Sequence, residues 1–194
     1  MTQEVSIAVL AGGQSRRMGR DKAQIELDGA TLLERIAYVA NVVAAAIVVG
    51  REQPADFEFD RIPFIEDREP GLGPIGGLQT ALLHFETPVV LVGCDMPLLD
   101  PEALQWLVER FAESNAPHGL TCIRDREFEP LFSVYRPACL ERIDTMIANG
   151  QRALHRLIQD GDFDEVDVPA SVARHLLNIN TPDELEQLRE LLRG

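Results

Sequence analysis

Positive charge is scarce in this chain of 194 residues. It carries 18 lysine and arginine side chains against 32 aspartates and glutamates, for a net charge of −14. A surface of that sign repels the phosphates of DNA and RNA, so we expect no general nucleic-acid binding. The count describes the whole surface and leaves room for a locally basic pocket.

Cysteine is also rare. Its three occurrences are odd in number, widely spaced and never arranged as Cys-x-x-Cys: Cys94, Cys122 and Cys139. This pattern argues against a disulfide framework and a structural zinc site, and it fits a reducing cytoplasm. Because no base lies beside Cys94 in the sequence, we interpret it as a small buried residue rather than a nucleophile.

Long apolar runs are missing as well. The longest, from Ile36 to Gly50, is interrupted by Asn41 and is too short to span a bilayer. The first ten residues lead straight into a strand pattern, without a basic segment and cleavage site. We therefore expect a cytoplasmic protein that does not contact membranes.

Strand-like apolar runs alternate with helix-like segments along the whole chain. Strands are predicted at 5–10, 47–49, 62–65, 89–92, 120–123 and 131–135, with weaker ones at 166–168 and 175–177. Helices are predicted at 31–44, 75–84, 101–111, 137–148, 151–159 and 181–192. This alternation predicts a three-layer α/β/α fold with a mostly parallel central sheet. Such sheets bind ligands beyond the carboxyl ends of their strands, which points to the loops after Leu10, Ile65 and Val92.

The loop after the first strand is rich in glycine and arginine. It reads Leu10-Ala11-Gly12-Gly13-Gln14-Ser15-Arg16-Arg17-Met18-Gly19-Arg20-Asp21-Lys22. Glycines let the backbone approach a ligand with its N–H groups pointing inward. Four cations and one acid within seven residues favour an anionic partner over a plain surface loop. The Gly-Lys-Ser/Thr ending of a P-loop is absent, so we predict a phosphate site of another kind.

A formal dinucleotide fingerprint, Gly-x-Gly-x-x-Gly, lies at 71–76, and Asp95 follows at a suitable distance for a ribose-binding acid. Fingerprint glycines should follow their strand at once, whereas the segment 66–70 intervenes here. Pro74 also occupies the tight turn. An NAD-dependent oxidoreductase remains a competing hypothesis, which tight NADH binding at this loop would support.

An acid follows the strand predicted at 89–92, in the segment Gly93-Cys94-Asp95-Met96-Pro97. A carboxylate there can hold Mg²⁺, which prefers one or two carboxylates completed by phosphate oxygens and water. The alternative is that Asp95 caps the next turn, as Asp100 is expected to do before Pro101.

These segments together resemble those of nucleotidyltransferases that activate sugars and cofactors, and most of all the molybdenum cofactor guanylyltransferase family. The resemblance rests on the first loop, on Asp67 with the glycines at 73–77, and on the Cys-Asp-x-Pro segment at 94–97. It implies a single domain, 1–194, of the Rossmann-like nucleotide-diphospho-sugar transferase type. The nucleotide-binding part would cover about 1–100 and the acceptor-binding part about 101–194.

The resemblance also implies roles for individual residues. Asp95 would be the Mg²⁺ ligand, with Lys22 and Arg16 as catalytic cations at the phosphates. The implied nucleotide contacts are Leu10, Ala11, Gly12, Gly13, Lys22, Asp67 and Asp95. Weaker similarity in the second half, including Asn-x-Asn-Thr-Pro at 178–182 and Gly-x-Arg at 150–152, suggests the acceptor-side candidates Asn180, Asn178 and Arg152. Arg17 of the first loop is a further candidate of this group.

The reaction implied is transfer of GMP from GTP to Mo-molybdopterin, with release of pyrophosphate. A molybdenum insertion protein and apo-molybdoenzymes would be further partners. Gly12-Gly13 favours guanine over the Ala-Ala-Gly typical of cytidylyltransferases, whereas Gly50 replaces an asparagine of some members and leaves base preference open. A sugar-phosphate nucleotidyltransferase and a non-catalytic adaptor, which would bind GTP without releasing pyrophosphate, also remain open.

Overall fold

Short runs of aliphatic residues form the parallel half of the central sheet. The computed structural model describes residues 4–12, 21–57, 59 and 61–193. In spatial order the parallel strands are β5 (Phe64–Ile65), β4 (Ala45–Val49), β1 (Ser6–Leu10) and β6 (Val89–Gly93). Because β1, β4 and β6 are covered on both faces, they read as nearly continuous apolar runs rather than alternating ones.

The other half of the sheet contains the antiparallel strands. β9 (Phe132–Tyr135) pairs antiparallel with both β6 and β7 (Gly119–Arg124), so β7 again runs in the direction of β6. β10 (Phe163–Asp167) pairs parallel with β7 and forms the edge, while the short β8 (Glu127–Phe128) pairs antiparallel with β7. The sheet is therefore mostly parallel, as predicted.

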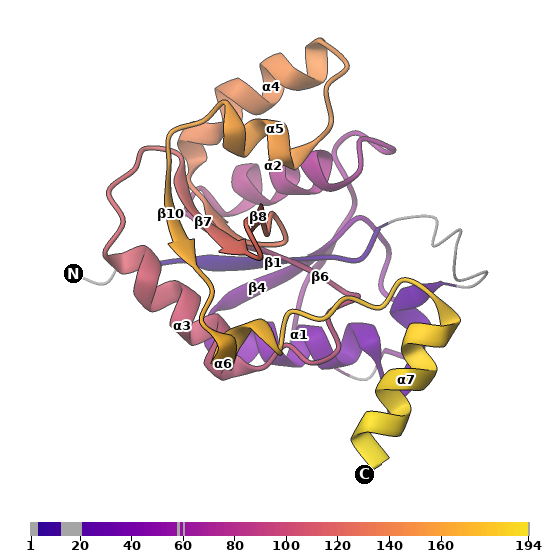
Figure 1. Cartoon of the computed structure of the whole chain (residues 1–194). Helices are drawn as coiled ribbons and strands as arrows, with labels where there is room; N and C mark the ends of the chain where they lie inside the picture. The colour runs from indigo at the N-terminus through magenta and orange to yellow at the C-terminus, as the bar shows by residue number, and fades with distance from the viewer. Residues whose placement is uncertain (1–3, 13–20, 58, 60, 194) are drawn as a thin grey trace.

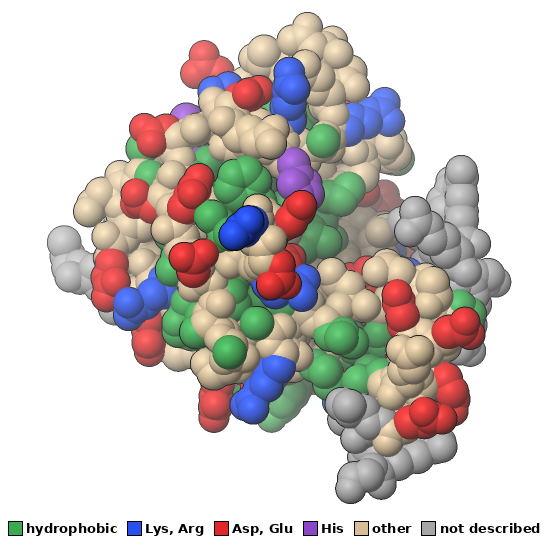
Figure 2. Space-filling view, in the orientation of Figure 1, with side chains coloured by type: hydrophobic (Ala, Val, Ile, Leu, Met, Phe, Trp, Pro, Cys, Tyr) green, Lys and Arg blue, Asp and Glu red, His purple; other side chains and the backbone are tan. Residues whose placement is uncertain are grey.

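Helices cover both faces of the sheet (Figure 1). One layer contains α1 (Leu32–Val43) and α3 (Pro101–Ala112), and the opposite layer contains α2 (Pro74–Phe85), α4 (Leu140–Ala148) and α5 (Leu154–Gln159). None of the helices in the described part of the chain is long and apolar enough to cross a membrane. On the face shown in Figure 2, acidic side chains are spread over the elements, with lysine and arginine side chains lying between them.

Neighbouring residues of one strand point into two separate cores. In β1, Ile7 and Val9 pack in the core beneath α1 and α3, whereas Ala8 packs in the core beneath α2 and α4. All three are fully buried. This alternation follows from the pleat of a strand and confirms the three-layer arrangement.

The last helix, α7 (Pro182–Arg193), packs on a small hairpin rather than on the sheet. The hairpin consists of β2 (Glu26–Leu27) and β3 (Ala30–Thr31), which the sequence did not predict. Leu185 and Leu188 of α7 join a third apolar cluster that also contains Leu27. The end of the chain is thereby tied to the segment that follows the first loop.

One predicted strand is wrong and a second is displaced. No strand forms at 175–177, because the N–H groups of His175 and Leu176 donate back to the carbonyls of Val172 and Ala173 in the turn after α6 (Ala170–Ala173). Leu176 is fully buried between two more exposed neighbours, which imitates the period of a strand. The strand predicted at 166–168 is β10, which begins earlier.

Candidate active site

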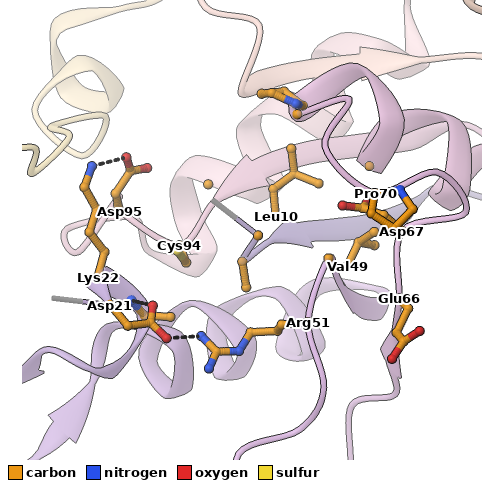
Figure 3. A pocket seen from close by; sticks show the side chains of 18 of the residues that line it. Leu10, Asp21, Lys22, Val49, Arg51, Glu66, Asp67, Pro70, Cys94 and Asp95 are labelled. Atoms are coloured by element: carbon orange, nitrogen blue, oxygen red, sulfur yellow. Dashed lines mark hydrogen bonds and ion pairs between the residues drawn. The ribbon is translucent and has the colours of Figure 1, made fainter. Parts of the chain in front are cut away.

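An open pocket of about 950 Å³ lies at the carboxyl edge of the parallel strands (Figure 3). Its walls come from the ends of β1, β4 and β6, the segments that follow these strands and β5, and the start of α2. This is the crevice in which open α/β sheets bind ligands, because several loops converge there. The three loops selected from the sequence therefore meet in one place.

Two backbone segments touch at the floor of this pocket. The N–H of Ala11 donates to the carbonyl of Val49 at 3.0 Å. A Cβ added at Gly12 would lie 3.1 Å from the carbonyl oxygen of Gly50, and one added at Gly50 would lie 3.0 Å from the Cα of Gly12. Gly50 also has a φ of +93°, which L side chains rarely adopt. An asparagine at Gly50 would therefore require the two segments to separate.

Lys22, Asp95 and Asn180 meet at one side of the pocket. Lys22 begins the 3₁₀ turn η1 (Lys22–Gln24), and its Nζ lies 3.2 Å from Asp95 Oδ2 (Figure 3). The same Nζ donates to Asn180 Oδ1 at 2.7 Å. The Lys22 and Asp95 side chains are only 15% and 22% exposed, so solvent screens their attraction less than on an open surface. Three residues selected from distant motifs are thus in direct contact.

The segment around Asn180 lies against the loop after β6. The N–H of Ile179 donates to the carbonyl of Asp95 at 2.9 Å, and the Ile179 side chain is fully buried. Asn178 is partly buried, and its Oδ1 has no hydrogen-bond partner among the described residues. Of the two asparagines, it is Asn180 whose side chain reaches Lys22.

Asp67 lies on the opposite side of the pocket from Asp95 (Figure 3). Its Oδ1 is buried and accepts no hydrogen bond from any residue that the structure describes. Burial raises the pKa of this carboxyl above its ordinary value. A Cβ at Gly77 would approach this Oδ1 to 3.7 Å and would collide with Leu10 at 2.5 Å, so glycine keeps this side of the pocket open. Asp67 therefore has unused capacity to accept N–H donors from a ligand.

A second ion pair, not selected from the sequence, fixes the end of the first loop. Asp21 Oδ1 accepts the N–H of Ala23 and so caps η1, while its Oδ2 lies 2.9 Å from an Nη of Arg51 (Figure 3). Arg51 follows β4 directly after Gly50, the position at which the sequence departs from some family members. The guanidinium therefore links two pocket loops. The sequence signal was an arginine in a pocket loop of a strongly acidic chain.

Four candidate residues from the sequence remain: three lie outside the described residues, and one lies at the rim of the pocket. Gly13, Arg16 and Arg17 lie outside the described residues. Arg152 is exposed and donates to the carbonyl of Gly71 at 3.0 Å, on the rim of the pocket.

Burial, reinforced by Asp95, raises the pKa of Cys94 to about 12, so its thiol stays protonated at neutral pH and is a poor nucleophile.

The oxygen atoms at this side of the pocket suit a magnesium ion that is held partly by substrate and water, rather than a metal held by protein side chains alone. Within the ranges the structure covers, no three His, Cys, Asp or Glu side chains gather into a group that could hold a metal. Mg²⁺ needs only one or two carboxylates when substrate phosphates and water complete its octahedron. The Asp95 carboxylate, with the Asn180 amide oxygen one ammonium away, meets that requirement.

Known proteins resemble this chain in sequence over most of its length. Residues 7–166 match the MobA-like NTP transferase domain. A "Probable molybdenum cofactor guanylyltransferase" of Natronomonas pharaonis is 37% identical, over 95% of this chain and 96% of that protein. A protein of the same name from Aquifex aeolicus is 30% identical, over 93% and 88%.

Solved structures of nucleotidyltransferases superimpose on this chain. The crystal structure of molybdopterin-guanine dinucleotide biosynthesis protein A from Archaeoglobus fulgidus superimposes with a TM-score of 0.81 at 26% identity, covering 97% of this chain and 98% of that one. A cytidylyltransferase for 2-C-methyl-D-erythritol 4-phosphate from Thermus thermophilus shares the fold, with a TM-score of 0.68 at 18% identity, covering 98% and 100%. The oxidoreductase hypothesis is thereby replaced: the chain belongs to the MobA-like NTP transferase family.

Proposed function

We propose that this protein transfers GMP from GTP to Mo-molybdopterin in an Mg²⁺-dependent reaction that releases pyrophosphate. The observation that carries the proposal is the contact of Lys22 with Asp95 and Asn180, at the edge of the sheet where the glycine loop begins. The names of the relatives support the choice of nucleotide and acceptor.

In this reaction a terminal phosphate oxygen of the acceptor forms a bond to the α-phosphorus of GTP. The bond from that phosphorus to the bridging oxygen of the β-phosphate breaks, and pyrophosphate leaves with the electron pair. Negative charge accumulates on the α-phosphoryl oxygens and on the leaving group, so cations fixed in advance lower the barrier. Lys22 supplies one such cation, since its Nζ is already held beside Asp95.

Asp95 would hold the magnesium ion, with the Asn180 oxygen close by. When bound there, Mg²⁺ neutralises phosphate charge and polarises the α-phosphoryl group. Asp95 Oδ2 lies 3.2 Å from Lys22 Nζ, so the residue that would hold the metal ion and the residue that would contact the phosphates are neighbours.

Asp67 would hold the nucleoside at the other side of the pocket. Guanine presents adjacent N–H donors on its Watson–Crick edge, and the unpartnered Oδ1 of Asp67 is an acceptor suited to them. The pocket volume, about 950 Å³, lies at the upper end of the range for small-molecule sites. That size suits a nucleotide together with part of an acceptor.

The proposal is tested by measuring pyrophosphate release with Mg²⁺ and molybdopterin, for GTP, CTP and ATP separately. We expect release with GTP, loss of release on chelating Mg²⁺, and loss in Asp95→Ala. Release with CTP alone would replace guanylyl transfer by cytidylyl transfer. GTP binding without release from any nucleotide would favour a non-catalytic adaptor, and near-normal turnover of Asp95→Ala would remove the metal assignment.

Cytoplasmic location and delivery of the product to a molybdenum insertion protein or an apo-molybdoenzyme remain predictions. The same holds for acceptor binding by Arg152, Arg17 and Asn178.

A further inference from the structure

The first turn of α7 is connected to the active site through a short series of hydrogen bonds. We propose that Glu184 is a positioning residue that holds Asn180 against Lys22 and thereby fixes the ammonium group at the phosphate site. The role of Lys22 rests on the proposed function, whereas the contacts that lead to it do not.

Glu184 does more than cap its own helix. Its Oε2 accepts the N–H of Thr181 at 3.0 Å, and the Thr181 hydroxyl accepts the N–H of Glu184 at 3.3 Å, which together form a capping box. The same Oε2 also accepts the N–H of Asn180 at 2.6 Å, one residue further back. A capping box closes the helix end with the first two bonds alone. The third bond restrains the backbone of a residue in the active site.

The backbone around Asn180 is held by two contacts, one at the preceding residue and one at the Asn180 N–H itself. On one side, Ile179 is fully buried and donates to the Asp95 carbonyl at 2.9 Å. On the other side, Glu184 holds the N–H of Asn180 itself. The Asn180 Oδ1 then accepts from Lys22 Nζ at 2.7 Å. The position of this oxygen, and of the ammonium bonded to it, follows from these two anchors.

Packing makes α7 and the Lys22 segment one unit. Leu185 and Leu188, beside Glu184 on α7, share an apolar cluster with Ile25 and Leu27, which follow η1 directly. All four are at most 4% exposed. Both ends of the contact between Lys22 and Asn180 are therefore carried by elements that pack on each other. The match to the family domain covers residues 7–166, so α7 lies beyond the matched segment.

Lys22 is the only lysine of the chain; every other basic side chain counted with it is an arginine. A lysine ammonium is a point charge on a flexible stem, so its placement must come from its neighbours. Holding it before the substrates arrive lowers the barrier to reaction more than it strengthens binding. Loss of Glu184 should therefore lower kcat more than it raises the KM for GTP.

The matched control is Asp164, on the opposite edge of the sheet. Its carboxylate likewise accepts two consecutive N–H groups, those of Asn115 and Ala116, at 3.0 and 3.1 Å. Asp164→Asn therefore weakens a comparable interaction far from the pocket loops, as Glu184→Gln does at the pocket. A merely structural role for Glu184 predicts that the two sites behave alike.

The kinetic experiment compares Glu184→Ala, Glu184→Gln and Asp164→Asn in pyrophosphate release. For Glu184→Ala we expect kcat to fall about tenfold with less than a threefold change in the KM for GTP, because misplaced catalytic groups act mainly on the reaction step. Glu184→Gln should recover part of the loss, since its amide oxygen can still accept one N–H. Asp164→Asn should keep the wild-type kcat even where it lowers Tm.

A second measurement reports on Lys22 without any turnover. Isotope labelling of lysine gives a single side-chain NMR signal, because the chain has one lysine. In the nucleotide-free protein, Glu184→Ala or Glu184→Gln should shift this signal, and Asp164→Asn should leave it in place. An unshifted signal together with a kcat within twofold of wild type overturns the proposal. A shifted signal in a protein that releases no pyrophosphate overturns the proposed function and leaves the positioning role standing.

Discussion

The charged side chains have different partners at the two ends of the parallel strands, called here the amino edge and the carboxyl edge of the sheet. At the amino edge, Asp164 accepts the Ser114 hydroxyl and two backbone N–H groups, and Arg136 donates to the carbonyls of Ser114 and Ala116. At the carboxyl edge, Lys22 is paired with Asp95. Asp67 there keeps an oxygen without a partner among the described residues.

This difference separates interactions that serve stability from those that serve binding. A charge bonded to nearby backbone closes a loop and has little capacity left for a ligand. A charge paired with another side chain, or carrying an unused lone pair, can exchange that interaction for a substrate group. Changes at the carboxyl edge should therefore alter catalysis, and changes at the amino edge should alter stability.

The largest effect is expected at the lysine. Lys22→Met keeps the length of the side chain and removes its charge, which leaves Asp95 without its cation. We expect kcat/KM to fall about 10²- to 10³-fold in pyrophosphate release, the cost of losing one group that stabilises developing charge. The control is Arg156→Met, which breaks an exposed pair between Arg156 of α5 and the C-cap residue Asp160 and should keep full activity. A loss of less than threefold in Lys22→Met would contradict the assignment.

Asp67 is expected to have a smaller effect on catalysis, and it should also affect stability. Asp67→Asn should raise the KM for GTP about 10- to 100-fold, because a hydrogen bond to a charged group contributes about 1.5–3 kcal/mol. The exposed Glu69 gives the control Glu69→Gln, with an unchanged KM expected. An unchanged KM in Asp67→Asn would exclude Asp67 as the nucleoside contact.

The same substitution should stabilise the ligand-free protein. Burial raises the pKa of Asp67, so the folded state resists its ionisation, and stability falls as pH rises from the ordinary value of 3.8 through the raised one. Asparagine does not ionise. The Tm of Asp67→Asn should therefore exceed that of wild type at neutral pH, and the difference should close at pH values below the ordinary carboxyl pKa.

Much of the fold followed from local sequence signals. The helices predicted at 31–44, 75–84 and 101–111 form within one residue of their expected ends, because Thr31 and Asp100 provide caps and Pro74 and Pro101 begin helices. The strand predicted at 175–177 failed because alternating burial arises in a turn as well as in a strand. The hairpin of β2 and β3 is too short to leave a periodic signal.

The site was predictable in its residue types but not in its contacts. Lys22, Asp95 and Asn180 were each selected from a separate motif, and only folding brings together residues 158 positions apart. The sequence predicted a helix at 181–192, and Thr181 and Glu184 form the capping box at its start. Its bond to the N–H of Asn180 depends on the loop geometry, which local patterns do not encode.

At the amino edge the expected effect is on stability alone. The Ser114 hydroxyl and the N–H groups of Ala116 and Asn115 hold the pKa of Asp164 below its ordinary value. Stability from this group is present above the unfolded-state pKa and is lost as pH falls through the lowered one. Asp164→Asn should therefore lower Tm by a few degrees at neutral pH, and thermal melts should show the gap closing in acid. A gap that persists at low pH would mean that the loss is steric.

The smallest effect concerns the whole surface rather than either edge. With a net charge of −14, the acidic side chains repel one another and destabilise the folded state. Salt screens this repulsion, because it shortens the Debye length from about 10 Å at 0.1 M to about 3 Å at 1 M. Sodium chloride should therefore raise Tm by a few degrees over that range. Exposed pairs such as Arg110–Glu113 contribute about 0–1 kcal/mol, so screening them offsets little of the gain.

The salt effect can be separated from specific contacts by neutralising acids that line no part of the pocket. Glu109, Glu165 and Asp167 are exposed on α3 and β10. A variant carrying Glu109→Gln, Glu165→Gln and Asp167→Asn should melt higher than wild type at 0.1 M salt and gain less from added salt. If its Tm rises with salt as steeply as that of wild type, the stabilisation comes from salt acting on apolar burial and not from net charge.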